Sequence, residues 1–406
     1  MPKKIAVIGG GIAGIEISIK LSLLGFKVYL LEKRPFLGGN AVNLYKFFPT
    51  DDCSTCISLG DMRTCFYRSK LSEIRNLKIL TGVSITNIRN SNKEFEIEIL
   101  KQPTYIDASK CRLCGACVEV CKSNAILAPQ NLQAIPLSYV IDIEKCSKCY
   151  ECSNICKFSA INLDEGEEKQ KLNVHGIVIA TGFEEWKPEE IKNYGYGRYR
   201  NVITQLELAE MLCKGNLPEG DRFLMILCVG SRDKHHRYCS KICCTYALKH
   251  AIMLRELGKD VSICYIDIRT YGRHEEYYTR ARELGVRFIR GKPGEIVEDR
   301  KSEKLKVFVE DIESGELKEE IYDVVVLTPA LIPSPSNKKI AEMLGIDIDE
   351  YGFIRQLNPK LRKVETGKKG IYVCGCASGI KDVSEIAVET SSLALDIYLD
   401  IGERKW

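Results

Sequence analysis

Apolar and polar positions follow one plan twice along the chain. The first copy, "KIAVIGGGIAGIEISIKLSLLGFKVYLLEK" from Lys4, predicts a buried strand, a glycine turn, an amphipathic helix and a second strand. The second copy covers residues 222–268, where "RFLMILCVG" is followed by a cysteine-bearing turn, "CCTYALKHAIMLRELG" and "DVSICYIDI". Strands that alternate with helices are typical of an α/β fold built on parallel sheets.

The first turn has the spacing of a dinucleotide-binding fingerprint. Gly9, Gly11 and Gly14 fit G-x-G-x-x-G, in which the first glycine permits the turn, the second lets a pyrophosphate approach and the third packs the helix on the strand. Glu32 ends the second strand, where a carboxylate can bind ribose hydroxyls. Because strand, helix and acid all fit, we favour a bound dinucleotide over a glycine turn of purely structural use.

Three further segments resemble the two-dinucleotide-binding flavoproteins, a thioredoxin-reductase-like fold. These are the glycine pair in "LEKRPFLGGN", the A-T-G strand in "LNVHGIVIATGF" and the late flavin-contacting segment in "KKGIYVCGCASG". The resemblance implies FAD. It also implies an Asp for the ribityl chain where this chain has Cys376 and Ala377, so we expect the backbone or the next helix to make that contact. The residues expected at the FAD are Gly9, Gly11, Ala13, Gly14, Glu32, Lys33, Gly39, Asn40, Val83, Ala180, Thr181, Gly182, Gly375 and Asp382.

Composition excludes several classes of function. The formal net charge of +4 is small against 59 basic and 55 acidic side chains, so neither nucleic acid nor a membrane surface is expected as a partner. We expect no membrane span, because apolar runs fall short of roughly 20 residues. The start, "MPKKIAVIGG", reads as a strand and not as a signal peptide. We therefore expect a cytoplasmic protein whose 19 cysteines are metal ligands or redox groups.

Eight of the cysteines form two runs with one spacing. "CRLCGACVEVCK" and "CSKCYECSNICK" are both C-x2-C-x2-C-x3-C, as in bacterial ferredoxins with two clusters, where the fourth cysteine of each run binds the other cluster. The predicted ligands are Cys111, Cys114, Cys117 and Cys156 for one 4Fe–4S cluster, and Cys146, Cys149, Cys152 and Cys121 for the other. Zinc is the alternative for C-x2-C pairs, but the doubled run favours iron–sulfur clusters.

Four more cysteines surround the turn of the second copy, where Gly230 replaces the expected glycine fingerprint. They are Cys228, Cys239, Cys243 and Cys244. The backbone N–H groups and macrodipole of the predicted helix start would favour an anion such as a thiolate-ligated 4Fe–4S cluster. Alternatively, some of these cysteines are small buried apolar side chains.

Longer motifs resemble the flavin-binding A subunits of heterodisulfide reductases over essentially the whole chain. They are "FFPTDDCSTCI", "YGYGRYRNVIT", "YCSKICCTYALKHA", "YIDIRTYGRHEEYYTRARELGVRFIRG" and "GCASGIKDVSEIAVETSSLA". The resemblance implies that the four cysteines around Gly230 hold a third 4Fe–4S cluster beside the flavin and that the nicotinamide site is lost. It also implies a catalytic Lys249 near the flavin. Methanogen members resemble a longer chain, so we expect this one to be a compact form of the same subunit.

The function implied is that of an oxidoreductase acting within a complex. FAD and three 4Fe–4S clusters would pass electrons to or from partners resembling subunits B and C, which handle disulfide or sulfur substrates; some relatives bifurcate electrons. A hydrogenase-, dehydrogenase- or ferredoxin-type electron partner and a homodimer are further options. One alternative is a self-contained NAD(P)H-dependent disulfide reductase using Cys53 and Cys56, the C-x2-C pair in "DDCSTC". Another is the flavin subunit of a quinone-interacting membrane complex.

These patterns predict a flavin domain interrupted twice. The FAD-binding domain would comprise residues 1–104, 165–200 and 326–406. A ferredoxin domain would occupy residues 105–164, and a degenerate NAD-like domain with its own cluster would occupy residues 201–325. Placing a ferredoxin inside the flavin domain would fix its clusters relative to the flavin, as an electron path requires.

Overall fold

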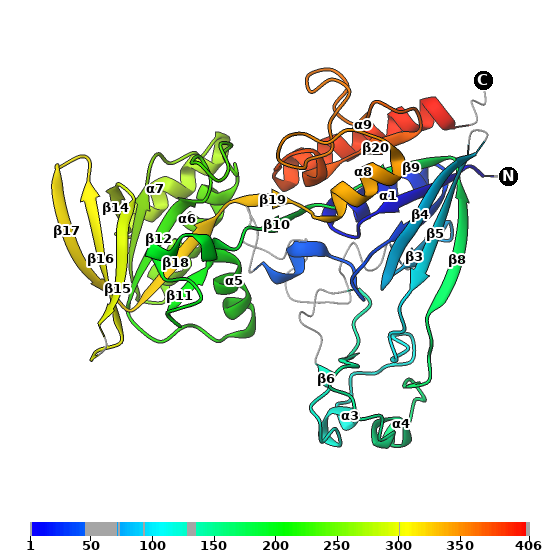
Figure 1. Ribbon diagram of the computed structural model, residues 1–406, viewed down its shortest axis with the longest axis horizontal. Helices are drawn as coiled ribbons and strands as arrows, with labels where there is room; N and C mark the ends of the chain where they lie inside the picture. The colour runs from blue at the N-terminus through cyan, green and yellow to red at the C-terminus, as the bar shows by residue number, and fades with distance from the viewer. Residues whose placement is uncertain are drawn as a thin grey trace. The chain divides into compact units, whose positions relative to one another are not determined.

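The computed structural model describes residues 2–44, 71, 74–91, 94–127, 135–299 and 301–402. The chain divides into two compact units (Figure 1). The first contains the chain up to Val42, the stretch that ends at Gly182 and the stretch from Pro333 onward, and the second contains Phe183–Ile332. None of the helices within the described ranges combines the length and apolar character that crossing a membrane requires.

A five-stranded parallel sheet forms the centre of the first unit, in the order β20-β9-β1-β2-β3. Its strands are β1 (Lys4–Ile8), β2 (Lys27–Leu31), β3 (Leu77–Leu80), β9 (Gly176–Ile179) and β20 (Ile371–Val373). Nearly every residue of β1, β2 and β9 is buried, as expected of a parallel sheet that is covered on both faces. The strand–helix–strand pattern read from the sequence is thus confirmed, with α1 (Ile12–Leu23) between β1 and β2.

A three-stranded antiparallel sheet packs on one face of this parallel sheet. It consists of β4 (Val83–Ser91), β5 (Glu94–Lys101) and β8 (Glu168–Val174). Alternate residues of β5 are buried, and they share one core with Ala6, Ile8 and α8 (Ser336–Leu344). The helices α1 and α9 (Val383–Ile401) pack on each other.

Between β5 and β8 the chain forms a small insert made of two similar halves. Three pairs of residues, each 35 positions apart, have positive φ: Leu113 and Lys148, Gly115 and Tyr150, Asn124 and Ser159. A short helix follows in each half, α3 (Ala116–Glu119) and α4 (Glu151–Ile155). Equal spacing of the cysteines has therefore produced equal backbone turns.

Each half of the insert closes on the end of the other half. β6 (Ile126–Leu127) pairs with β7 (Val140–Ile141), and the equivalent bridge joins Ile106 to Ile161. The backbone hydrogen bonds repeat as well, because Asp142 N–H donates to the Ala125 carbonyl at 2.8 Å and Asp107 N–H to the Ala160 carbonyl at 2.7 Å. This exchange carries the last cysteine of each run toward the other half.

The second unit repeats the layers of the first. Its parallel sheet has the order β11-β18-β12-β13-β14, and an antiparallel sheet of β15, β16 and β17 packs beside it. The parallel strands are β11 (Val202–Thr204), β12 (Arg222–Val229), β13 (Asp260–Tyr265), β14 (Arg287–Arg290) and β18 (Val324–Pro329). The antiparallel strands are β15 (Pro293–Asp299), β16 (Lys304–Asp311) and β17 (Glu316–Tyr322), and the helices are α5 (Gln205–Lys214), α6 (Cys243–Glu256) and α7 (Glu275–Glu283).

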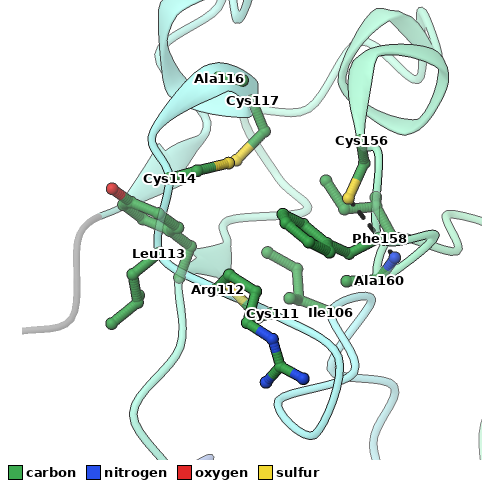
Figure 2. A pocket seen from close by; sticks show the side chains of 12 residues that line it. Ile106, Cys111, Arg112, Leu113, Cys114, Ala116, Cys117, Cys156, Phe158 and Ala160 are labelled. Atoms are coloured by element: carbon green, nitrogen blue, oxygen red, sulfur yellow. Dashed lines mark hydrogen bonds between the residues drawn. The ribbon is translucent and has the colours of Figure 1, made fainter.

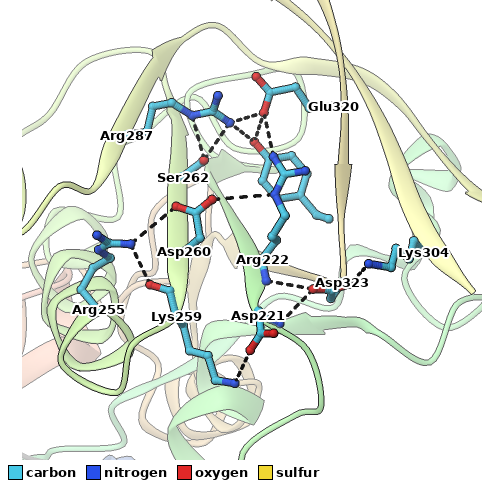
Figure 3. A network of polar contacts seen from close by, with 11 residues as sticks. Asp221, Arg222, Arg255, Lys259, Asp260, Ser262, Arg287, Lys304, Glu320 and Asp323 are labelled. Carbon is cyan, nitrogen blue, oxygen red and sulfur yellow. Dashed lines mark hydrogen bonds and ion pairs between the residues drawn. The ribbon is translucent and has the colours of Figure 1, made fainter.

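Charged residues join the starts of β12 and β13 in this unit (Figure 3). One carboxylate oxygen of Asp323 accepts the N–H groups of Asp221 and Arg222 at 2.8 and 2.9 Å, and its other oxygen pairs with Lys304 at 3.0 Å. The side chain of Arg222 lies 3.7 Å from Asp260. These groups occupy the amino ends of the parallel strands, so the carboxyl ends, where α/β sheets bind ligands, remain for a functional site.

Candidate functional site

The glycine turn of the first unit has the geometry that its spacing predicts. Gly9 has φ +110°, and a Cβ there would lie 2.3 Å from the Ala180 carbonyl oxygen. A Cβ on Gly14 would lie 1.8 Å from the Gly9 carbonyl oxygen, so α1 can rest on β1 because residue 14 is glycine. A Cβ on Gly11 would have no atom closer than the Gly39 Cα at 3.9 Å, so the approach to the turn is open at this position.

The start of α1 can receive an anion. Among the described residues, no side chain caps this helix and no acidic residue occupies its first turn. The N–H groups and macrodipole of a helix start favour negative charge, such as that of a pyrophosphate. The residues present therefore fit a dinucleotide.

Glu32 is buried beside this turn. Its carboxylate accepts the Gly10 N–H at 2.6 Å and the Arg34 N–H at 2.8 Å. Each carboxylate oxygen can accept more than one hydrogen bond, so both retain capacity for ribose hydroxyls. Val83, also predicted at the FAD, donates its N–H to the Glu32 carbonyl at 3.0 Å.

The remaining predicted FAD residues gather at the same edge of the sheet. A Cβ on Gly39 would lie 2.9 Å from the Gly11 Cα, and a Cβ on Gly375 would lie 2.6 Å from the Ala13 Cβ. The exposed Lys33 follows Glu32, and the side chain of Asn40 accepts from Arg34 at 3.2 Å. Ala180, Thr181 and Gly182 directly follow β9, and Asp382 caps α9 by accepting the Glu385 N–H at 2.8 Å.

In the insert, one pocket brings together four predicted cluster ligands from both cysteine runs (Figure 2). Cys111, Cys114 and Cys117 line it together with Cys156, and its empty space of about 350 Å³ includes open solvent. Burial and the charges of the neighbouring thiols raise the pKa of Cys117 to about 11, although a backbone hydrogen bond partly opposes them. Metal binding would have to displace that proton, since the thiolate is the ligand form.

The second set of insert cysteines also lies together. Burial raises the pKa of Cys152, and the charges of Cys146, Cys149 and Cys121 raise it further. The Ala125 N–H donates to the Cys121 sulfur at 3.3 Å. An equivalent bond joins the Ala160 N–H to the Cys156 sulfur at 3.4 Å, and the Lys148 N–H donates to Cys146 at 3.4 Å. Such bonds favour the charged form of a sulfur ligand.

The cysteine turn of the second unit lies at the end of β12. The β12–β18 register shifts between Ile226 and Val229, and Cys228 has φ +57°. Cys243 and Cys244 are the first two residues of α6, which has neither a side-chain cap nor an acidic residue in its first turn within the described part of the chain. The start of α6 thus has the same electrostatic preference for an anion as the start of α1.

The thiols of this turn interact with one another. A hydrogen bond from Cys243 lowers the pKa of Cys239 to about 5 and lowers that of Cys244, while the pKa of Cys243 itself is raised well above its usual value. Burial raises the pKa of Cys228, and the charges of Cys244 and Cys239 add to this. The four cysteines therefore lie within electrostatic reach of one another.

Three basic residues that the sequence analysis missed surround these thiols. Lys292 donates to the Cys228 carbonyl at 2.9 Å, and Arg232 pairs with Asp267. Lys292 and Arg232 both lower the pKa of Cys228, and Arg269 and Arg232 lower that of Cys239. Lys292 and Arg269 lie far from Cys228 in sequence, so no local signal pointed to them, whereas Arg232 lies within the cysteine turn itself.

Gly230 serves a packing purpose in this turn. It has φ +69°, and a Cβ there would lie 2.2 Å from the Trp186 ring. His236 also contacts that ring, with 5.6 Å between ring centroids, and its Nδ1 lies 2.7 Å from the Gly230 carbonyl oxygen. Gly230 thus accommodates an aromatic side chain, whereas the equivalent turn of the first unit leaves space that a phosphate could occupy.

Of the three predicted catalytic residues, the structure describes Lys249 alone. Lys249 is buried in α6, next to His250, whose Nδ1 lies 2.6 Å from the Gln205 side-chain oxygen. Cys53 and Cys56 lie outside the described residues. Across the described ranges, no group of three or more His, Cys, Asp or Glu side chains has a geometry that could hold a metal ion.

Two parts of the chain match known protein families. Residues 104–127 match the family described as a 4Fe-4S binding domain, and residues 7–44 match an NAD(P)-binding Rossmann-like domain. Among solved structures, the chain is similar to thioredoxin reductase of Lactococcus lactis, with a TM-score of 0.56, 16% identity and 98% of each chain covered. It is also similar to a NAD-dependent persulfide reductase from A. fulgidus, with a TM-score of 0.55, 16% identity, and 99% of this chain and 60% of that one covered. These likenesses confirm the thioredoxin-reductase-like fold.

Curated relatives match along almost the whole sequence. The chain is 40% identical to an iron-sulfur A subunit of CoB–CoM heterodisulfide reductase from Methanopyrus kandleri and 39% identical to the corresponding protein of Methanocaldococcus jannaschii. Each match covers 99% of this chain and 64% of the relative, so the chain spans less than two thirds of the length of these relatives. Over almost its whole length, the chain is thus a homologue of iron–sulfur A subunits of heterodisulfide reductase.

Proposed function

We propose that this chain is the flavin-binding, electron-transferring subunit of a complex related to heterodisulfide reductase. The observation that carries the proposal is the crossed pair of cysteine sets in the insert, one of which lines a single pocket. Sets of this kind hold 4Fe–4S clusters, which carry single electrons. Since the insert interrupts a flavoprotein fold, electron transfer between flavin and clusters is the function that best accounts for both.

FAD is the cofactor proposed for the first unit. The turn from Gly9 to Gly11 and the uncapped start of α1 would bind its pyrophosphate, and the buried Glu32 would orient its ribose. When bound, FAD supplies the exchange between electron pairs and single electrons. The chain contributes the binding groups and fixes the orientation of the cofactor.

Three 4Fe–4S clusters complete the proposed set of cofactors. The two cysteine sets of the insert would hold two of them, and the cysteine turn of the second unit would hold the third. Arg232, Arg269 and Lys292 support the third site, because nearby cations favour the more negative, reduced form of a cluster. Lys249, by the family resemblance, would act beside the flavin.

The partners proposed are iron–sulfur subunits resembling subunits B and C. A relative in Methanococcus maripaludis is named as the A subunit of an "H(2)/formate:CoB-CoM heterodisulfide,ferredoxin reductase", a name that associates this relative with disulfide and ferredoxin chemistry. For the present chain we propose a disulfide or sulfur substrate handled by the partners. We also propose electron bifurcation at the flavin. Two further proposals are an electron partner of the hydrogenase, dehydrogenase or ferredoxin type, and a homodimer.

Anaerobic purification from native extract tests this function most directly. The expected complex contains FAD, about twelve iron atoms per copy of this chain in its three sites, and further iron–sulfur subunits. Disulfide reduction should require those subunits. Full turnover by the lone chain, abolished by Cys53→Ser and unaffected by Cys149→Ala, would instead support the NAD(P)H-dependent disulfide reductase. Co-purification with a quinone-reactive membrane protein would support the membrane complex.

A further inference from the structure

In the first unit, the ion pair between Lys381 and Glu389 binds both the backbone N–H and the backbone carbonyl of Gly375. The Gly375 N–H donates to one carboxylate oxygen of Glu389 at 2.6 Å, and the Gly375 carbonyl accepts from Lys381 Nζ at 2.8 Å. Lys381 and the other carboxylate oxygen of Glu389 lie 3.2 Å apart. The pair therefore clamps the turn after β20, which continues as the short helix η6 (Gly375–Ser378).

The clamp is buried and its groups are occupied. The exposed fractions are 15% for the Lys381 side chain and 8% for that of Glu389. Lys381 Nζ also donates to the Ser378 hydroxyl at 2.8 Å. Removing one partner would leave a buried charge without its counterion, which costs far more than the loss of an exposed pair.

The clamped turn lies against the dinucleotide turn of the same unit. A Cβ on Gly375 would lie 2.6 Å from the Ala13 Cβ, at the start of α1. The carbonyl of Ala377, two residues later, accepts from the Asn337 side chain at 3.3 Å, and the Asn337 side-chain oxygen accepts from the Thr181 hydroxyl at 2.5 Å. The turn thus approaches the Gly-rich segment directly and is linked to the A-T-G segment through Asn337.

Two side chains that could have contacted a cofactor here are engaged elsewhere. The Cys376 sulfur accepts the Lys381 N–H at 3.4 Å and lies 3.5 Å from the Lys381 carbonyl oxygen. Asp382 and Glu385 form a reciprocal capping box at the start of α9, in contrast to the uncapped start of α1. The backbone of the clamped turn can therefore contribute contacts with the cofactor of its own, beside the contact predicted for Asp382.

We propose that Lys381 and Glu389 are positioning residues of the flavin site, which hold the Gly375–Ser378 backbone in the conformation that contacts FAD. The inference rests on the proposed binding of FAD by the first unit. Because the pair is neutral as a whole, it fixes the turn without adding net charge beside the flavin. Substitution of either residue should therefore change both the affinity for FAD and the flavin potential.

The test compares variants of the full-length chain whose flavin has been removed and whose clusters are intact. In an FAD titration, Glu389→Gln and Lys381→Met should each weaken binding about ten- to hundredfold, the range for loss of a buried charge-assisted hydrogen bond. Lys381→Arg should recover part of the affinity, and Lys381→Met combined with Glu389→Met should cost less than the sum of the two single changes. Lys171→Met removes two exposed ion pairs of the same unit, those with Glu96 and Glu98, and should leave binding unchanged.

The flavin potential at saturating FAD separates positioning from simple loss of fold. A tenfold change in the relative affinity for oxidised and reduced FAD corresponds to about 30 mV for this two-electron couple. Wild-type affinity and potential in Lys381→Met and Glu389→Gln would overturn the inference while leaving the proposed function intact. Equal loss in Lys381→Arg and Lys381→Met, together with loss of insert iron, would also overturn it, since the pair would then serve folding alone. Failure of the wild-type chain to bind FAD would refute the proposed function itself.

Discussion

The turns β1–α1 and β12–α6 occupy equivalent places in the two units, yet their contents differ. Both lie between the central strand of a five-stranded parallel sheet and the helix that follows it. The first turn is Gly9–Gly11 and brings α1 so close that Gly14 admits no Cβ. The second extends from Gly230 to Ile242, and no glycine occurs in the first turn of α6. The longer second turn thus carries thiols where the first carries glycines.

What the two turns share is an electrostatic preference. Within the described ranges, neither α1 nor α6 has a side-chain cap or an acidic residue in its first turn. Both helix starts therefore favour an anion, and the residues around each decide which anion fits. In the first turn, glycine would leave space for a pyrophosphate that approaches the backbone. In the second, we propose that cysteine supplies the ligands of an iron–sulfur cluster.

Loss of one ligand should abolish the cluster of the second turn. We expect Cys243→Ala to reduce the iron content from about twelve to about eight atoms per chain while FAD content stays constant. Cys213→Ala is the matched control, because Cys213 belongs to none of the three predicted ligand sets. Iron analysis and electron paramagnetic resonance on anaerobic protein provide the measurement. An unchanged iron content in Cys243→Ala would show that this turn holds no cluster.

Two glycine substitutions should distinguish cofactor space from packing space in the first turn. At Gly14 a Cβ would lie 1.8 Å from backbone, so Gly14→Ala should lower the free energy of unfolding by about 2–4 kcal/mol. At Gly11 a Cβ would lie 3.9 Å from its nearest neighbour, and the φ of −78° is one that alanine adopts readily. Gly11→Ala should therefore fold normally. It should nevertheless bind FAD roughly ten- to hundredfold more weakly, because its methyl group would occupy the approach to the turn.

Thermal unfolding and FAD titration of both variants are the measurements. Gly367→Ala is the control, since a Cβ there has open space around it. Wild-type FAD affinity in Gly11→Ala would show that the pyrophosphate does not lie against this glycine.

Local spacing allowed the glycine turn and the cysteine runs to be predicted from sequence, because the physical requirement lies within a few residues. In the insert, for example, equal cysteine spacing accompanies equal positive-φ positions such as Leu113 and Lys148. The crossed ligand sets stay a prediction, made because ferredoxin runs of this spacing exchange their fourth cysteines. The pocket that joins Cys156 to the first run agrees with that expectation.

Contacts between distant segments could not be predicted in the same way. Lys292 reaches Cys228 across 64 positions, and the Trp186 ring, which follows the short strand β10 (Phe183–Glu185), lies against Gly230. The positive φ of Cys228 depends on a register shift between β12 and β18, which has no sequence signature. Such features arise from packing, so only the folded chain reveals them. The roles of Lys249, Cys53 and Cys56 stay predictions.

The low pKa of Cys239 should make its reactivity depend on pH differently from that of an ordinary cysteine. The hydrogen bond from Cys243 lowers this pKa to about 5, so the cluster-free protein should carry a thiolate here throughout pH 6–8. Alkylation of Cys239, followed by peptide mass spectrometry, should therefore vary little with pH over that range. A free cysteine with a pKa of about 8.5 should react roughly tenfold faster per pH unit as the pH rises toward 8. In Cys243→Ala, the pH midpoint of Cys239 alkylation should rise, whereas an unshifted midpoint would contradict the hydrogen bond.

The smallest expected effect concerns the basic side chain beside Cys228. Lys292 donates to the Cys228 carbonyl at 2.9 Å and lies 3.8 Å from Asp233. Its positive charge should stabilise the reduced cluster more than the oxidised one, because reduction adds a negative charge. Lys292→Met should thus lower the one-electron potential of this cluster by about 20–60 mV, that is, by up to about 1.4 kcal/mol.

Redox titration followed by electron paramagnetic resonance would measure the shift. Lys234→Met removes an exposed lysine from the same turn and should change the potential less, because solvent screens its charge. The flavin potential should stay at its wild-type value in both variants if each turn controls only the carrier it binds. Equal shifts in Lys292→Met and Lys234→Met would mean that the net charge of the turn sets the cluster potential, and that the contact between Lys292 and Cys228 has no special part in it.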